Sequence, residues 1–535
     1  MPLFSIVTPV YETPLDALDE CIRSVVSQSF TDWEWCLVDD ASPSPAARNR
    51  LAELQANDPR IRLVHRDTNG GIVAASNDAL AIADGEFVVL LDHDDVLAVD
   101  ALADIARVIE AQPDVDYIYS DEDKITPDGR HYEEFRKPGW SPERLRGQNY
   151  CSHISVIRRR IVDAVGRFRE GFDGSQDHDL VLRVTEKTRK IHHIPRVLYH
   201  WRAVPGSTAV AVSEKPYAMD ASIRAVREHC ERVGIDADVG ASAPWPVVRV
   251  KRRLAATPIV SIVIPTRGTK KHLFGVETVL VVNCVDSVLR NSTYPNVEVV
   301  VVVDADTPDK VVADLRALDP NRVVIVTFDK PFNFSAKCNL GVVNSTGDYV
   351  LLLNDDTEVI TPEWIEEMLG YFWDDDVGMV GPLLLLEDGR IQSAGHSYAV
   401  HHHNYGNHMP GNSVGPFGML KVAHEVSGVT GACALIRRSA YFDVGGFSTV
   451  FPSSFNDVDF GYKLLDRGFR IIWTPHARLF HFESATRERS VSEIETAALR
   501  SRWGSRFNRD EYCRDAWSLE HLAGRPLEPS PNQPR

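Results

Sequence analysis

EFVVLLDHDD, residues Glu86–Asp95, sets five apolar residues between an acidic residue and a run of four polar ones. A short, unbroken apolar run is typical of a strand buried on both faces of a parallel sheet. Open α/β sheets hold their ligands at the carboxyl ends of such strands. Asp92 and Asp94, separated by one residue, have the spacing of carboxylates that share Mg²⁺ or Mn²⁺ with a substrate phosphate. A polar turn after a buried strand would have the same composition, so this stretch alone leaves both interpretations open.

The same pattern occurs a second time at Tyr349–Asp356, YVLLLNDD. Other short segments return in the same order along the chain. They are SIVTP (Ser5–Pro9) as SIVIP (Ser261–Pro265), SQDHDLVLR (Ser175–Arg183) as FNDVDFGYK (Phe455–Lys463), and Asn77 and Asn339, each 15 residues before Asp92 or Asn354. So many ordered matches predict an internal duplication of one catalytic-type unit of roughly 220 residues.

Composition excludes several classes of protein. The chain has 535 residues, 44% of them hydrophobic and 25% charged, which is typical of a globular protein with two to four domains. A net charge of −18 argues against a dedicated nucleic-acid binder, which needs a basic surface. The eight cysteines form no CxxC pair, and the first residues enter a strand without a signal segment. Because no apolar run is long enough to cross a bilayer, we expect a soluble, cytoplasmic protein that could still contact a membrane surface.

Strand and helix patterns alternate through the first 100 residues, as expected for a parallel α/β sheet with acids at its strand ends. Residues 121–148 are polar and contain prolines, and we expect a loop there. The predicted division is 1–212 for a first domain, 213–256 for a helical and extended linker, 257–490 for a second domain, 491–525 for a helical extension and 526–535 for a disordered tail.

Each unit presents three separate acidic positions. The middle one, at Asp92, suits a diphosphate held through a metal ion. The one after the second strand, at Asp40, suits hydrogen bonds to a base or ribose. The third, Asp177 and its counterpart Asp457, can serve as a general base on an acceptor hydroxyl. Helix N-capping is the competing interpretation for these two carboxylates. Together the three positions predict transfer from an activated, phosphate-linked donor to a hydroxyl.

The motifs SIVTPVYE, VDDAS, LLDHDD and GSQDHDLVLR, in this order, resemble the inverting family 2 glycosyltransferases of the GT-A fold. The second half, with FNFSAKCNLG, LLLNDDTEV, GVTGACALIRR and HFESATR, resembles the bacterial polysaccharide branch of that family. LYHWRAVPGSTA resembles its tandem-domain members. The resemblance covers residues 3–212 and 257–490 and implies an α/β fold of two tandem GT-A-like, Rossmann-like nucleotide-sugar-binding domains.

This resemblance implies a set of site residues and a divalent cofactor, Mg²⁺ or Mn²⁺. The implied catalytic bases are Asp177 and Asp457. The implied metal ligands are Asp92, Asp94 and His200 in the first unit and Asp356 and His481 in the second; Asp94 is the expected direct ligand. The implied donor-binding residues are Pro9, Tyr11, Glu12, Asp40, Asn69 and Asp92, then Pro265, Asp304, Asn354 and Asp355.

The sequence departs from the family pattern in three places. Asn354 replaces the first acid of the DxD pair, which removes one negative charge from the second metal site. Arg267 stands where Tyr11 stands, so it can meet a diphosphate rather than stack on a base. Gln176 and Asn456 precede the two bases where the family often has Glu. The histidines, including His200 and His481, can also be interpreted as packed core residues.

The leading hypothesis is therefore a tandem hexosyltransferase that builds a cell-surface polysaccharide. Its partners would be a UDP-, dTDP- or GDP-linked sugar and an oligosaccharide or lipid-linked acceptor, with peripheral contact at the inner face of the plasma membrane. In the alternative, one unit, preferably the second, is a non-catalytic sugar- or acceptor-binding module. A nucleotidyltransferase needs a glycine-rich basic loop after the first strand, and a dehydrogenase needs GxGxxG there; SIVTPVYETP has neither.

Overall fold

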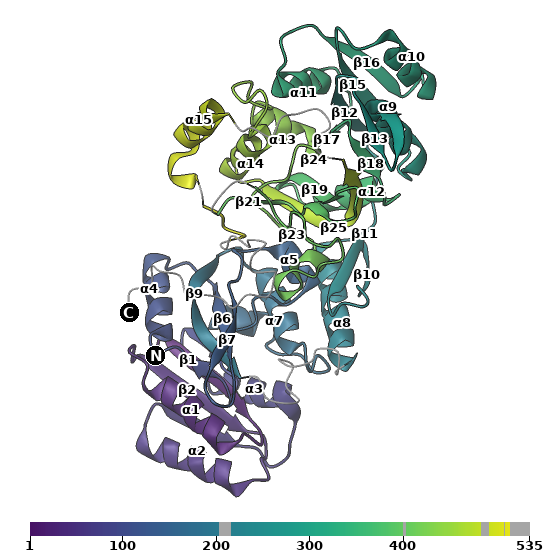
Figure 1. The fold of residues 1–535 in the computed structure, drawn as a ribbon. Coiled ribbons are helices and arrows are strands. Elements are labelled where there is room, and N and C mark those ends of the chain that lie inside the picture. Colours follow the sequence, from purple (N-terminus) through teal and green to yellow (C-terminus); the bar gives the residue numbers. More distant parts are fainter. Residues whose placement is uncertain (203–215, 400–402, 483–491, 508, 514–535) are drawn as a thin grey trace. The chain divides into compact units, whose positions relative to one another are not determined.

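The computed structural model describes residues 1–202, 216–399, 403–482, 492–507 and 509–513. The chain folds into two compact units, unit 1 (Met1–Val250) and unit 2 (Lys251–Arg535), and each contains its own large sheet flanked by helices (Figure 1). The predicted tail, 526–535, lies outside the described residues. Within them, no helix combines the length and apolar character that crossing a membrane requires.

Unit 1 alternates strands and helices in its first half and is less regular in its second. Its strands are β1 Phe4–Val10, β2 Trp33–Asp39, β3 Ile61–His65, β4 Phe87–Leu90, β5 Val96–Leu97, β6 Tyr117–Ile125, β7 His131–Phe135, β8 Ser155–Arg158, β9 Ile191–Arg202 and β10 Ala237–Ala241, with β11 Val248–Arg252 at the junction. Its helices are α1 Leu15–Val26, α2 Pro45–Asn57, α3 Gly71–Ala81, α4 Ala101–Ala111, α5 Pro142–Gly147, α6 Arg159–Ala164, α7 Gln176–Thr185 and α8 Pro216–Val233.

Unit 2 repeats this arrangement with additional short strands. Its strands are β12 Val260–Thr266, β13 Lys270–Leu273, β14 Val276–Val279, β15 Val297–Asp304, β16 Val323–Phe328, β17 Tyr349–Leu353, β18 Thr357–Val359, β19 Val377–Leu385, β20 Ile391–Ser393, β21 His396–Ser397, β22 His403–Asn404, β23 His424–Glu425, β24 Cys433–Arg437 and β25 Arg470–His481. Its α-helices are α9 Leu280–Asn291, α10 Asp309–Leu318, α11 Phe334–Val343, α12 Trp364–Leu369, α13 Arg438–Asp443, α14 Asn456–Asp466 and α15 Glu493–Trp503, and its 3₁₀ helices are η2 Gly370–Trp373, η3 Pro416–Lys421 and η4 Gly504–Arg506.

The two main sheets have the same strand order. In unit 1 it is β3-β2-β1-β4-β8-β6-β9-β5, and in unit 2 it is β16-β15-β12-β17-β24-β19-β25-β18. Equivalent side chains also make the same contacts in the two units. The amide of Asn77 hydrogen-bonds both the N–H and the carbonyl of Phe168, and the amide of Asn339 hydrogen-bonds those of Phe447. The structure therefore confirms the predicted duplication.

Each sheet is the middle of three layers. In unit 1, one face packs against α1, α2 and α4 through residues such as Ile22, Leu51 and Leu102. The other face packs against α3, α7 and α8 through residues such as Ala79 and Leu180. Unit 2 has α9, α10 and α12 on one face and α11, α13 and α14 on the other. With both faces covered, the central strands are apolar throughout, which explains the unbroken runs in the sequence.

The expected parallel pairing is confirmed for β1–β4, whereas the complete sheet of unit 1 is mixed, because β8 is antiparallel to both β4 and β6. One other sequence-based expectation about unit 1 is wrong. The predicted loop at 121–148 instead contains the end of β6, all of β7 and α5. Its acidic strand residues, Asp121–Asp123, have no apolar periodicity of their own. Pairing with β9 holds them in the sheet, so tertiary contacts override the local signal.

Candidate active sites

In unit 1 the residues after β4 lie close to His153, a residue that no sequence motif singled out. Asp92 follows the strand with its side chain 44% exposed, and its carboxylate lies 4.0 Å from Nε2 of His153. Asp95 is buried and accepts hydrogen bonds from the Tyr199 hydroxyl and the Arg202 backbone N–H, each at 2.6 Å. One ligand atom from each of Asp92, Asp95 and His153 lies within 4.8 Å of the others. Two carboxylates and an imidazole suit a divalent cation, so these residues fit the predicted metal.

His153 is held in place by a buried chain of charges. Its Nδ1 lies 3.4 Å from Glu122, whose carboxylate is also 2.8 Å from Nζ of the fully buried Lys137. Its ring stacks on Tyr199 at 4.7 Å. Burial opposes a charged imidazole, but the bond to Glu122 outweighs it and raises the pKa of His153 to about 9. The carboxylate of Glu122 therefore offsets the cost of burying this imidazole.

Asp177 reaches this same group from the first turn of α7. It is the second residue of the helix, whereas Ser175 occupies the N-cap, so the N-capping interpretation does not hold. Burial, and then the neighbouring Asp92, raise the pKa of Asp177 to about 6. Nε2 of Gln176 lies 3.4 Å from its carboxylate. A carboxyl group whose pKa lies close to neutrality and that faces a metal-type cluster suits general-base catalysis.

The donor-binding candidates of unit 1 lie along the same edge of the sheet, at the ends of β1 and β2. Asp40 accepts hydrogen bonds from the backbone of Gly70 and Gly71 at 2.9 and 2.8 Å, and its own carbonyl accepts one from Asn69 at 3.3 Å. These contacts fasten the loop before α3 to the end of β2. Pro9 lies in β1, and Tyr11 and Glu12 follow it, with Tyr11 41% exposed. Donor contact by these five residues stays a prediction.

Two predicted metal ligands of unit 1 are not part of the Asp92 group. Asp94 lies beside His93, at 3.9 Å, and burial raises its pKa. His200 bonds Asp123 and contacts the ring of His131. Its neighbours in β9, Tyr199 and Trp201, both contact the ring of His153. Because side chains alternate along a strand, His200 lies on the opposite face of β9.

Strand register explains this placement. The equivalent strands β1 and β12 serve as the reference for comparing the two units. β4 pairs with β1 in the same register as β17 with β12, so Asp92 and Asn354 occupy equivalent positions. The pairing of β2 with β1 and of β15 with β12 likewise makes Asp40 and Asp304 equivalent. His481 pairs with Thr357, three positions after Asn354, but His200 pairs with Val96, four positions after Asp92. The residue of unit 1 at the position of His481 is therefore Trp201. A shift of one residue turns a side chain to the other face.

In unit 2 the residues after β17 form a comparable cluster. Nε2 of His481 lies 3.3 Å from Asp356 and 3.4 Å from the amide nitrogen of Asn354. Burial would raise the pKa of Asp356, but His481 outweighs it and the pKa is lowered. The amide oxygen of Asn354 is buried without a hydrogen-bond partner among the described residues. That oxygen, the carboxylate and the imidazole together fit a divalent cation with one charge fewer than in unit 1.

Asp457 lies next to this cluster. Its carboxylate accepts the N–H of Gly431 at 3.0 Å, and the next residue, Ala432, accepts the N–H of Asn354 through its carbonyl. It is the second residue of α14, like Asp177 in α7, and it bonds the N–H of Val458 at 2.9 Å. The structure thus gives both predicted bases the same place in their units.

The donor-binding candidates of unit 2 have different partners from those of unit 1. Asp304 is bonded at 2.8 Å by Nζ of the buried Lys337, which also donates to the carbonyl of Thr266. Asp355 points inward and accepts the Thr266 hydroxyl at 2.6 Å, and burial, then Asp356, raise its pKa to about 7. Pro265 lies in β12. Lys337 lies in FNFSAKCNLG, one of the segments that carry the family resemblance, but that resemblance assigned no role to it.

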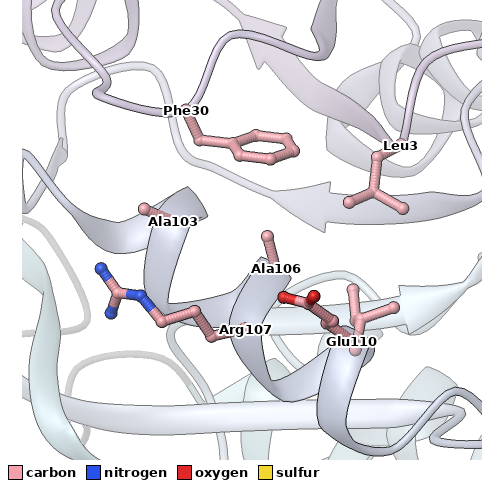
Figure 2. Close-up of a pocket in the computed structure, with 7 residues that line it drawn as sticks. Leu3, Phe30, Ala103, Ala106, Arg107 and Glu110 are labelled. Carbon is pink, nitrogen blue, oxygen red and sulfur yellow. The ribbon is translucent and has the colours of Figure 1, made fainter.

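A hollow of about 440 Å³ lies elsewhere in unit 1. Figure 2 shows Leu3 and Phe30 facing Ala106 and Arg107 of α4 across it. Leu3 precedes β1 and Phe30 precedes β2, so the hollow lies at the amino ends of the strands. Ligands of open α/β sheets bind at the carboxyl ends, and the hollow is therefore no candidate for the donor site. The sequence of unit 2 also contains a histidine-rich stretch with His396, His401, His402, His403 and His408, of which His401 and His402 lie outside the described residues.

Comparison with known proteins shows to which family the chain is similar. The model of the glycosyl transferase family 2 matches residues 5–166 and 261–445, one segment in each unit. An uncharacterized protein of Sinorhizobium fredii, y4gI, is 40% identical over 99% of this chain and 57% of its own length. The O-antigen biosynthesis protein RfbC of Myxococcus xanthus is 37% identical over 91% of this chain and 38% of its own. A chondroitin synthase of Escherichia coli is 28% identical over 44% of this chain.

The chain thus spans little more than half the length of the first of these relatives and less than half of the second. The family segments begin one residue inside β1 and β12 and extend beyond β4 and β17, so they include the acidic clusters that follow these two strands. The match confirms the expected α/β fold of two tandem domains and the expected enzyme class. The chain belongs to glycosyl transferase family 2.

Proposed function

We propose that this chain is an inverting, metal-dependent glycosyltransferase with one donor site in each unit. It would move sugars from UDP-, dTDP- or GDP-linked donors to a saccharide or lipid-linked acceptor. One observation carries the proposal: in each unit a carboxylate that can act as a base lies next to the candidate metal ligands. Asp177 lies beside Asp92 in unit 1, and Asp457 lies beside Asn354 in unit 2. The relative named for O-antigen biosynthesis supports a cell-surface polysaccharide as the product.

Divalent cations would be held by Asp92, Asp95 and His153 in unit 1 and by Asn354, Asp356 and His481 in unit 2. Bound Mg²⁺ or Mn²⁺ supplies charge neutralisation for the departing nucleoside diphosphate. The buried Glu122–Lys137 pair orients His153, and Tyr199 orients Asp95, so the ligands are held by hydrogen bonds before the donor arrives.

The transfer itself needs one base in each unit. Asp177 takes the proton of the acceptor hydroxyl while that oxygen forms a bond to the anomeric carbon of the sugar. The bond from this carbon to the diphosphate oxygen breaks in the same step, and the leaving nucleoside diphosphate keeps the electron pair. Attack from the side opposite the leaving group inverts the anomeric centre through an oxocarbenium-like transition state. Asp457 has the same role in unit 2.

Different donors for the two units are supported by the residues at the end of the first strand. Unit 1 presents the ring of Tyr11, whereas unit 2 presents Arg267, 58% exposed and 3.7 Å from Asp304. An aromatic ring can stack on a base, whereas a guanidinium binds phosphate through a planar, bidentate group. We expect the enzyme to act on the cytoplasmic side of the plasma membrane, where it could reach a lipid-linked acceptor peripherally.

The test is nucleoside diphosphate release by the purified chain with a panel of nucleotide sugars, an acceptor extract and either Mg²⁺, Mn²⁺ or a chelator. Release that requires the divalent ion is the expected result. A second candidate for unit 2, a non-catalytic sugar-binding module, is favoured by the missing charge at Asn354. In that case turnover would come from unit 1 alone while unit 2 still binds glycan. Absence of metal-dependent release with every donor would contradict the proposed enzyme.

A further inference from the structure

We propose that unit 1 contains a second metal site, formed by Asp123, His131 and His200, which takes a transition-metal ion such as Zn²⁺ or Co²⁺. The three residues come from β6, β7 and β9. Nδ1 of His200 lies 2.6 Å from Oδ1 of Asp123, and Nδ1 of His131 lies 2.9 Å from Oδ2 of the same carboxylate. One ligand atom from each residue lies within 4.8 Å of the others.

The pairing of the strands brings these three side chains to one face of the sheet. Asp123 pairs with His200 across β6 and β9, and Ile125, on the same face as Asp123, pairs with His131 across β6 and β7. Between Glu122 and Lys124 the β6–β7 register shifts, so Asp123 lies at a bulge. Bulges redirect single side chains at sheet edges and near sites.

The proposed site is distinct from the donor site of unit 1. Glu122, the neighbour of Asp123, bonds His153, and Trp201, the neighbour of His200, contacts the ring of His153. Neighbouring residues of a strand point to opposite faces. The Asp123 cluster and the Asp92 group therefore lie on opposite faces of β6 and β9, and each can be removed without altering a ligand of the other.

The donor set indicates which class of ion fits. Two imidazoles and one carboxylate suit zinc and the neighbouring first-row metals, whereas Mg²⁺ and Ca²⁺ prefer oxygen alone. Around tetrahedral zinc, with ligand bonds of about 2.1 Å, neighbouring ligand atoms are about 3.4 Å apart. The ligand atoms at 2.6 and 2.9 Å need to separate only slightly to accept an ion.

A metal at this position would fasten a weakly buried hairpin to the sheet. Three of the five residues of β7 are exposed, and the side chain of His131 is 54% exposed. A strand with so little buried surface gains stability from an ion that ties it to β9. Exchange of the β7 amides should accordingly slow when metal is added.

The test is metal binding by the full chain, stripped with a chelator and dialysed against Co²⁺ or Zn²⁺, with bound metal counted by elemental analysis. Co²⁺ also reports its ligands through visible absorption. The variants are His131→Gln and His200→Gln. His192→Gln, on the same strand, is the matched control, and a second control combines Asp92→Asn with Asp356→Asn to remove ligands of both donor sites.

We expect each of the two histidine variants to bind one ion fewer per chain than the wild type and to lose the metal-induced slowing of amide exchange in β7. The His192→Gln variant should keep both, and the donor-site double variant should keep the absorption band. Equal stoichiometry and affinity in His131→Gln and the wild type would overturn the proposal. Because His131 is mostly exposed, that variant should fold even if His200→Gln does not, which thermal melting of the metal-free proteins checks.

Discussion

Turnover in unit 1 should fall as the pH is lowered through 6, because Asp177 must be ionised to accept a proton. Burial is the largest cause of its raised pKa of about 6, and the charge of Asp92 is the second. A cation bound at Asp92 would cancel the second cause but not the first. A carboxyl group with a raised pKa takes up its proton at a higher pH than usual, so the loss of base lies at mildly acidic pH.

The magnitude follows from the pKa. A group with a pKa of 6 is about 90% ionised at pH 7, half ionised at pH 6 and about 10% ionised at pH 5. Since the rate follows the ionised fraction of the base, kcat/KM should fall by at most about tenfold between pH 7 and pH 5, and by less where a bound cation cancels the charge of Asp92. A solvent-exposed aspartate with a pKa of about 3.9 would lose less than about a tenth of its activity over the same interval.

The assay is nucleoside diphosphate release in an Asp457→Asn background, so that unit 1 alone turns over, with metal ion held at saturation. Donor binding measured at each pH separates loss of base from loss of affinity. Asp177→Asn should lower the plateau by about 10²–10⁴-fold, the usual contribution of a positioned base. A rate that is unchanged down to pH 5, with binding intact, would refute the assignment of Asp177 as the base.

Three further predictions concern residues around the sites. Asn339→Ala should lower the free energy of unfolding by about 2–3 kcal/mol, because it leaves the buried backbone N–H and carbonyl of Phe447 unpaired; exposed Asn344→Ala is the control in urea titrations. His178, buried against a backbone carbonyl, has its pKa lowered to about 4, chiefly by burial. As the pH falls, the imidazole of His178 is therefore protonated in the unfolded chain before it is protonated in the folded one. The free energy of unfolding should drop by about 3 kcal/mol between pH 6.5 and pH 4. Denaturation of a His178→Gln variant should not show this loss. Lys337→Met removes the cation from a mostly buried ion pair, and thermal and urea denaturation should show unit 2 destabilised by about 3 kcal/mol with unit 1 unchanged.

Much of the donor-side geometry could be predicted from the sequence, because its signals are local. The apolar run before Asp92 predicts a buried strand, and the acids after it lie at the carboxyl end where the sheet holds them. Asp177 was found because its segment recurs around Asp457, and the structure places both at the start of equivalent helices. Because each motif occurs once in each unit, its recurrence distinguishes a site residue from a chance match.

The remaining site residues depend on tertiary contacts that no local pattern reports. His153 lies before β8, outside any motif, and its position depends on Glu122 and Lys137. His200 follows its base at a spacing of 23 residues and His481 at 24, and this difference of one residue decides on which face of the strand each imidazole lies. Such a difference is visible in the sequence, but its meaning requires the strand register.

The most direct test of the account compares donor turnover by four proteins: the wild type, Asp177→Asn, Asp457→Asn and the double variant, each with metal ion and an acceptor extract. We predict that each single variant retains release of one nucleoside diphosphate and loses another, and that the double variant releases none above background. Full turnover by the double variant, with each protein shown to be folded, would contradict the claim that these two carboxylates are the bases of two transferase sites.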